Sequence, residues 1–144
     1  MIAHEWLRHN ARIAVVDQIG SAGQNYCSVS NDATTSTVPL VRQLSAHALK
    51  ALIEGGTAFE LVDVRTEWER SLACIDGARL LDQTHHDTLL QMDRRTPMVF
   101  QCHHGIRSQQ AAEYFRHEGF RELYNLEGGI DAWSQLVDPS VPRY

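Results

Sequence analysis

Apolar residues along the chain fall into two kinds of pattern that alternate. Runs in which most positions are apolar predict strands covered on both faces, and they lie at 59–64, 75–81, 98–100 and 123–126. Around these runs, apolar residues recur every three or four positions, which predicts helices at about 46–54, 67–72, 84–92, 108–117 and 129–137. Strands that alternate with helices indicate a mainly parallel, doubly wound α/β sheet.

Polar residues and glycines at the ends of these segments support the helix boundaries. Ser45 is a favourable N-cap, and Thr66 with Glu69 forms a capping-box pattern at the start of the second helix. Thr84 is expected to cap the third helix. The glycine pair at 128–129 predicts a simple turn before the last helix.

Several side chains on the predicted helices have an expected environment. Trp68 and Leu72 are available for packing, and Trp133 is expected in the core. His85 and His86 are neighbours on one helix, so their side chains point in different directions and form no i, i+4 metal pair. We therefore expect these two histidines to face solvent.

The segment 98–119 joins a strand, a tight polar loop and a helix, and it contains the residues most suited to chemistry. The apolar run 98–100 leads to Cys102, the loop 103–107 follows, and Ser108 is expected to open the helix. The Cys102 thiol thus lies at the carboxyl end of a strand, below the amino end of a helix. Open α/β sheets bind ligands at this position, and unpaired amides there attract anions.

These surroundings are expected to favour the thiolate form of Cys102. Amide N–H groups, the helix dipole and the positive charge of Arg107 each stabilise a negative sulfur. A thiolate acts as a nucleophile and a sulfur carrier, whereas a thiol does neither. The alternative is a buried structural cysteine, but a loop of two histidines, a glycine and an arginine is a poor wall for a hydrophobic core.

Length and composition indicate one globular domain without a nucleic-acid or membrane partner. The 144 residues are 43% hydrophobic and 22% charged, and their formal net charge of −5 argues against binding to phosphate backbones. No apolar run reaches the length of a membrane span, and the first residues do not match a secretory signal. We therefore expect a cytoplasmic protein.

The cysteine count points to one functional thiol. Cys27, Cys74 and Cys102 cannot all pair within one chain, and their spacing fits no CxxC zinc pattern. A reducing compartment fits this count better than a disulfide scaffold. The sequence leaves open whether Cys74 resolves an oxidised Cys102, and it suggests no role for Cys27.

The amino-terminal part has a different composition from the rest. Residues 13–16 are candidates for a short strand, and 20–37 are rich in Gly, Ser, Asn, Asp and Thr, as loops and linkers are. We predict that residues 1–42 form an extension or linker and that residues 43–144 form the domain.

Four separated segments resemble the rhodanese-like domain family. They are LVDVRTEWE at 61–69, IDGA at 75–78, CHHGIRS at 102–108 and NLEGGIDAW at 125–133, and the resemblance covers about residues 43–137. It implies a doubly wound, mainly parallel five-stranded sheet with helices on both faces. The family more often has a glycine–histidine pair and a proline near 73–76. Rhodanese domains also occur behind glutaredoxin-like modules, so residues 1–42 are a candidate remnant of such a module.

The resemblance implies a sulfurtransferase that moves sulfane sulfur from thiosulfate or a persulfide to a thiol, a protein acceptor or cyanide. In this reading Cys102 carries the sulfur as a persulfide, and Arg107 stabilises the loop and steers anions. Asp63 and Arg65 would brace neighbouring loops without a chemical step. The remaining loop residues would cradle the persulfide: His103, His104, Gly105, Ile106 and Ser108. No cofactor or metal is expected.

Three other functions fit this loop less well than sulfur transfer. A non-catalytic interaction module of this shape would often lack the cysteine. Related phosphatases have five residues between Cys and Arg, whereas this chain has four, which suits the smaller sulfur atom. His103 and His104 either assist proton movement or rim the pocket, and the second is favoured. A metal site built from them and a cysteine needs a ligand geometry that the spacing does not support.

Overall fold

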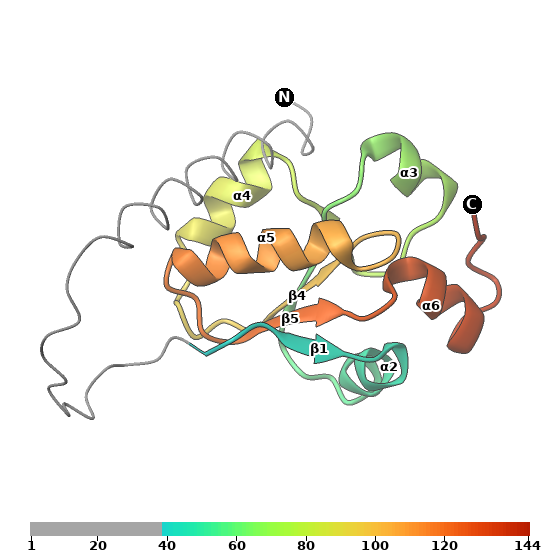
Figure 1. The fold of residues 1–144 in the computed structure, drawn as a ribbon, viewed down its shortest axis with the longest axis horizontal. Helices are drawn as coiled ribbons and strands as arrows, with labels where there is room; N and C mark the ends of the chain where they lie inside the picture. Colours follow the sequence, from blue (N-terminus) through green and yellow to red (C-terminus); the bar gives the residue numbers. More distant parts are fainter. Residues whose placement is uncertain (1–38) are drawn as a thin grey trace, which may run out of the picture.

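The structure, a computed structural model, describes residues 39–144. The predictions for the segments 13–16 and 20–37 and for Cys27 lie outside the described residues. Strands and helices alternate along the described part (Figure 1), in the order β1 (Arg42–Leu44), α2 (Ala46–Glu54), β2 (Glu60–Asp63), α3 (Glu67–Leu72), β3 (Arg79–Leu80), α4 (Gln83–Leu90), β4 (Met98–Gln101), α5 (Ile106–His117), β5 (Leu123–Leu126) and α6 (Gly129–Leu136). None of these helices has the length and hydropathy needed to cross a membrane.

The five strands form one parallel sheet in the order β1-β5-β4-β2-β3, with β4 in the centre. The predicted doubly wound, parallel five-stranded sheet is confirmed. The edge strand β1 was not predicted, and the domain boundary expected between residues 42 and 43 falls inside it. Because all neighbouring strands are parallel, their carboxyl ends lie at the same edge of the sheet, and Cys102 follows β4 there.

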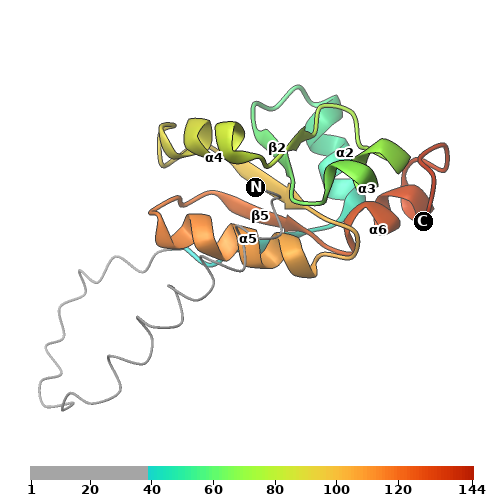
Figure 2. The ribbon, with the colours of Figure 1, turned by 90° about the horizontal axis from the view of Figure 1, so that it is seen from above.

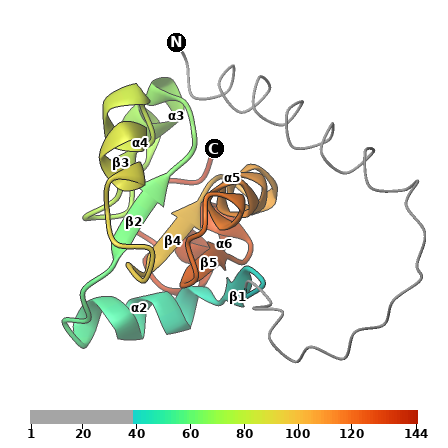
Figure 3. The same cartoon turned by 90° about the vertical axis from the view of Figure 1, so that its left-hand side faces the viewer.

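Helices cover both faces of the sheet, as predicted, and alternate residues of β4 enter two separate cores. Phe100 packs with Phe115 of α5 on one face, whereas Val99 belongs to a second cluster with Leu49 of α2 and Trp133 of α6. Figure 3 shows α2 and α5 on opposite sides of the sheet. The prediction that Trp133 is in the core is confirmed.

Two of the three predicted helix caps are present, and the third is a different residue. The Ser45 hydroxyl accepts a backbone hydrogen bond at the start of α2, and Thr66 and Glu69 form the reciprocal capping box of α3. The cap of α4 is Asp82, not Thr84, because the Asp82 carboxylate accepts the hydrogen bond of the His85 amide at 2.7 Å.

The exposure predicted for two histidines is wrong. His85 and His86 are 2% and 7% exposed, because α4 packs this part of its surface against the domain. His85 Nδ1 lies 3.0 Å from the Leu80 carbonyl oxygen, and His86 Nε2 lies 3.1 Å from the Tyr114 hydroxyl. Burial lowers the pKa of His85, since desolvation penalises the charged imidazolium.

The packing predicted for α3 is also wrong. Trp68 is 67% exposed and Leu72 is exposed as well. The residue that α3 buries is Glu69, which is polar. A buried carboxylate needs partners, and those partners belong to the site described next.

Candidate active site

Cys102 follows the central strand β4 and lies below the amino end of α5. The loop between them ends at Gly105, which has a φ of +98°, and α5 begins at Ile106, two residues before the predicted start at Ser108. Gly105 is required for two reasons: its backbone is left-handed, and a Cβ there would lie 3.2 Å from the Leu126 carbonyl oxygen.

Three hydrogen-bond donors converge on the Cys102 sulfur. The Gly105 amide lies 3.1 Å from Sγ, the Ser108 amide 3.4 Å, and the Ser108 hydroxyl 3.3 Å. Such a ring of donors stabilises negative charge on sulfur without help from solvent. Cys102 is only 1% exposed, so a reagent reaches the thiol only when neighbouring side chains move.

Asn125, in β5, holds this loop in place. Its Nδ2 donates to the Gly105 carbonyl at 3.1 Å, and its Oδ1 lies within hydrogen-bonding distance of the Ser108 hydroxyl. Because a hydroxyl has one hydrogen, Ser108 donates either to Asn125 or to the Cys102 sulfur at any moment. Sequence reasoning assigned no role to Asn125; its only signal was its place in the segment 125–133.

Arg107 forms a bidentate ion pair with Glu69. Nη1 lies 2.9 Å from Oε2, and Nη2 lies 2.7 Å from Oε1. The positive charge that the sequence placed beside the thiol is therefore paired with a carboxylate of α3, and it ties the first turn of α5 to that helix. The hydrogen bonds from Arg107 hold the pKa of Glu69 well below its usual range, against the opposing effect of burial.

We expect Glu69→Gln to destabilise the protein by about 1 to 3 kcal/mol at pH 7, because the hydrogen bonds lose the carboxylate charge and one of the two bonds from Arg107 is lost. Gln keeps the shape of Glu69, and its single carbonyl oxygen can keep the capping bond from the Thr66 amide, but its amide nitrogen is a donor and cannot accept from Arg107. The folded-state pKa of Glu69 is depressed, so its contribution is fully present above about pH 4.3 and is lost as pH falls through the folded-state value. In urea unfolding between pH 7 and pH 2.5, the gap between wild type and variant should narrow below about pH 4.3. A difference in the free energy of unfolding between wild type and variant that stays constant over this pH range would contradict the prediction.

Asp63 and Arg65 form a fully buried ion pair beside α3. Arg65 Nε and Nη2 donate to the two Asp63 oxygens at 3.0 and 2.7 Å. The other donors go to the carbonyls of Glu69 and Ala73 and to the Tyr144 hydroxyl, at 3.2, 2.7 and 3.0 Å. All five N–H donors of Arg65 thus have an acceptor, and the pair joins β2, α3 and the carboxyl-terminal segment.

Tyr144 reaches the site from the end of the chain. Its ring stacks on His103 at a centroid distance of 4.3 Å, and its hydroxyl donates to Glu69 Oε1 at 3.1 Å. His103 in turn stacks on His104 at 3.9 Å. Burial and the neighbouring His104 lower the pKa of His103. Figure 2 shows the carboxyl terminus beside α3 and α6. Sequence reasoning missed Tyr144, because no local pattern links it to residues 41 or more positions away.

The glycine pair before α6 is more than the simple turn that was predicted. A Cβ on Gly129 would overlap the carbonyl oxygens of Cys102 and His103. The Ile130 amide donates to the Cys102 carbonyl at 2.8 Å, and the Asp131 amide donates to the His103 carbonyl at 3.2 Å. The first turn of α6 therefore holds the backbone of the cysteine loop.

We expect Gly129→Ala to cost about 1 to 3 kcal/mol more than Gly56→Ala in urea unfolding, because only Gly129 has close neighbours. Both glycines are left-handed, with φ of +60° and +67°, so both variants carry similar backbone strain of about 1 to 2 kcal/mol. A Cβ on Gly56 meets nothing within 4 Å. Equal losses in the free energy of unfolding of the two variants would show that the close contact between Gly129 and the cysteine loop is unimportant for stability.

The other predicted residues of the loop form no hydrogen bond with the sulfur. Among the described residues, the hydrogen bonds to Sγ come from Gly105 and Ser108 alone. The Ile106 side chain is exposed to solvent, and His104 is 60% exposed in its side chain. Cys74 is an exposed free thiol, and it lines a cavity that Cys102 does not line.

Comparisons with known proteins agree with the fold. The sequence model of the rhodanese-like domain matches residues 45–136. The thiosulfate sulfurtransferase GlpE of Ectopseudomonas mendocina (strain ymp) is 39% identical over 74 residues, which are 51% of this chain and 68% of that relative. The protein of the same name from Shewanella oneidensis is 35% identical over 95 residues, covering 65% and 93% of the two chains. A rhodanese-like domain protein from Staphylococcus aureus superimposes with a TM-score of 0.59 at 27% identity, over 72% of this chain and 99% of that one.

Proposed function

The chain belongs to the rhodanese-like domain family, and from this premise we propose that it is a sulfurtransferase whose Cys102 carries the sulfur. The observation that carries the proposal is the convergence of the Gly105 and Ser108 amides on Sγ, at 3.1 and 3.4 Å, beside the Ser108 hydroxyl, which is shared with Asn125. Relatives named thiosulfate sulfurtransferase support thiosulfate as a donor. The family also includes domains without catalysis, and the cysteine with its donors favours the enzyme.

The reaction proceeds in two displacements. The Cys102 thiolate attacks the outer sulfur of thiosulfate or of a persulfide. A Cys102 Sγ–S bond forms, the sulfur–sulfur bond of the donor breaks, and sulfite or a thiolate leaves with the electron pair. An acceptor thiolate or cyanide then attacks the terminal sulfur. The Sγ–S bond breaks, and the thiolate of Cys102 is restored.

The residues around Cys102 act by position and charge. Negative charge lies on Sγ before the first step, and the amide donors from Gly105 and Ser108 are already oriented toward Sγ. After this step the charge lies on the terminal sulfur, one bond away from that ring of donors. Arg107 stabilises the loop through Glu69 rather than by contact with the sulfur. His103, His104 and Ile106 rim the approach to the thiol. No cofactor takes part in this scheme, and the two free thiols among the described residues fit a reducing, cytoplasmic setting.

The proposal is tested by intact-mass spectrometry of the full chain after incubation with thiosulfate. We expect the mass to rise by one sulfur atom, the added sulfur to map to Cys102, and cyanide to remove it as thiocyanate. A persulfide donor should give the same adduct. If neither donor forms an adduct, the chain is a binding module. Release of phosphate from an aryl phosphate, without any sulfur adduct, would assign it as a phosphatase.

A further inference from the structure

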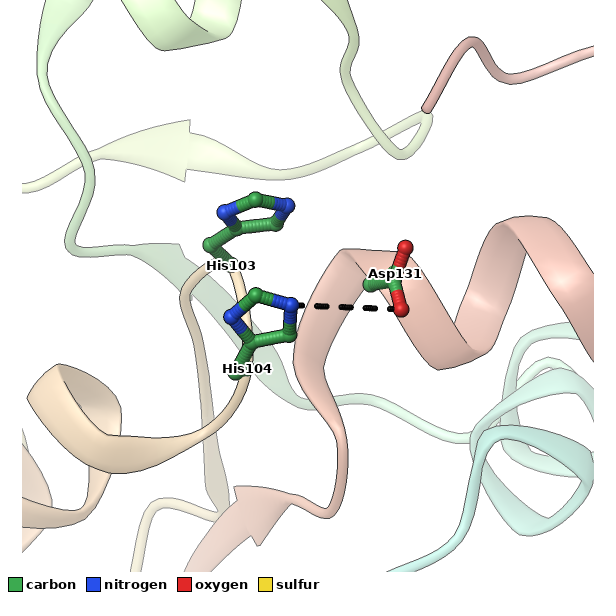
Figure 4. Close-up of side chains that lie close together, drawn as sticks. All are labelled: His103, His104 and Asp131. Carbon is green, nitrogen blue, oxygen red and sulfur yellow. Dashed lines mark ion pairs between the residues drawn. The ribbon is translucent and has the colours of Figure 1, made fainter. Parts of the chain in front are cut away.

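Three potential metal ligands meet at the rim of the cysteine loop. His103 and His104 belong to the loop, and Asp131 lies in the first turn of α6. One ligand atom from each residue lies within 4.8 Å of the others. Figure 4 shows the two imidazole rings one above the other, each with a nitrogen facing the Asp131 carboxylate. The closest measured approach to the carboxylate is 3.9 Å, from His104 Nε2 to Asp131 Oδ2.

The backbone already holds these ligands near one another. The Asp131 amide donates to the His103 carbonyl at 3.2 Å, so the loop and α6 are joined at this point. His103 is kept in place on its other side by the Tyr144 ring. The sequence argued against a metal site because the only ligand set that it suggested was the two adjacent histidines with a cysteine. The third ligand comes from a helix 27 positions further along, and the cysteine sulfur is occupied by other donors.

A tetrahedral ion with metal–ligand bonds of 2.0–2.1 Å needs its ligand atoms about 3.3 Å apart, so a cluster that spans up to 4.8 Å must contract by up to about 1.5 Å. Imidazole lone pairs lie in the ring plane, and those of two stacked rings do not meet at one point. His104 must therefore turn out of the stack, and its high exposure leaves it free to do so. Asp131 must also loosen its ion pair with Arg143 and the hydrogen bond that Oδ2 accepts from Gln135 at 2.7 Å. The Arg143 side chain is exposed, so its ion pair is weak.

We propose that His103, His104 and Asp131 form a binding site for a divalent transition-metal ion of the zinc type. Two imidazoles and one carboxylate suit Zn²⁺, Co²⁺, Ni²⁺ and Cu²⁺, whereas Mg²⁺ and Ca²⁺ prefer oxygen ligands throughout. Three protein ligands leave at least one coordination position for water or for a sulfur compound.

Occupancy of this site would restrain the cysteine loop, an effect that rests on the proposed sulfur transfer. A metal ion would link the two histidines to α6. Cys102 is 1% exposed, so a sulfur donor needs the surrounding side chains to move, and His103 and His104 directly follow Cys102 in its loop. The bound ion is therefore an inhibitor of persulfide formation.

Metal binding is tested first, without any reference to activity. Co²⁺ and Zn²⁺ are titrated into the full chain, and affinity is measured by competition with a chromophoric chelator and by the d–d spectrum of Co²⁺. We expect His104→Ala and Asp131→Asn each to weaken one binding event by about tenfold or more. His117→Ala, which removes another exposed histidine, should leave that event unchanged.

A control separates this site from the thiol. Cys102→Ser should retain the same binding event, and the Co²⁺ spectrum should lack a thiolate-to-metal charge-transfer band. Binding that survives both His104→Ala and Asp131→Asn, or that disappears in Cys102→Ser, overturns the proposal.

The inhibitory effect is tested second, by sulfur transfer with and without Zn²⁺. Zn²⁺ should slow sulfur transfer by wild type. In Asp131→Asn, the rate with Zn²⁺ divided by the rate of the same variant without metal should approach one. Binding without inhibition would confirm the site and refute the effect on the loop. Absence of sulfur transfer in metal-free wild type would refute the proposed function and leave the binding result standing.

Discussion

Replacement of Cys102 by serine should abolish sulfur transfer, with a loss of at least about a thousandfold in the rate of thiocyanate formation from thiosulfate and cyanide. A serine hydroxyl is not ionised at neutral pH, and its oxygen cannot carry sulfane sulfur as a persulfide. The fold should persist, because serine is slightly smaller and can accept the same hydrogen bonds from Gly105 and Ser108.

Cys74→Ser is the matched control for this experiment. Cys74 is exposed, and the cavity that it lines does not include Cys102, so the variant should keep sulfur transfer within about twofold of wild type. Substantial transfer by Cys102→Ser would place the sulfur carrier elsewhere and would overturn the mechanism. Loss of transfer in Cys74→Ser would show instead that the two thiols act together.

Arg65→Met should destabilise the protein by about 3 to 5 kcal/mol in urea unfolding at pH 7, because it removes one partner of a fully buried ion pair. Asp63 would remain buried, and its remaining cationic neighbour, Arg70, lies 3.5 Å away. The carbonyls of Glu69 and Ala73 would also lose their hydrogen bonds from Arg65. The free energy of unfolding of a typical domain is only about 5 to 15 kcal/mol, so this loss of stability should be large but measurable.

Lys50→Met makes the same kind of replacement in an exposed pair. Lys50 and Glu54 lie 3.7 Å apart on the surface of α2, so this variant should lose less than about 1 kcal/mol. Arg65→Lys should fall between the two, because it keeps the charge but cannot supply five donors in the geometry of a guanidinium. If Arg65→Met and Lys50→Met were equally stable, the buried network would have no structural importance.

Local signals in the chain were sufficient for every helix and for four of the five strands of the described residues, and for the position of the thiol. The apolar run of β4 predicted a buried strand, and the residues after it predicted a loop at the carboxyl edge of the sheet, where Cys102 lies. The caps Ser45 and Thr66 were predicted correctly because capping joins residues only three positions apart. Edge strand β1 was missed because its three residues are mostly exposed and have no apolar run.

The partners of the charged residues were not predictable in the same way. Arg107 was expected beside the thiol, but its partner Glu69 lies 38 positions earlier, and the two meet only when α3 and α5 pack at the same edge. Burial of His85 was missed for a related reason. Its helix is polar in sequence, and only the packing of α4 on the domain removes this ring from water.

The sequence by itself determined the order of the helices and of all strands but β1, the parallel sheet, and the thiol at the end of a buried strand, because these follow from patterns that span a few residues. Only the tertiary structure decided which groups surround that thiol. Asn125, Gly129 and Tyr144 come from segments 23 or more positions beyond Cys102, and their contacts with the loop arise from the packing of β5, α6 and the chain end. Such contacts depend on three-dimensional proximity, which no periodicity in the chain encodes.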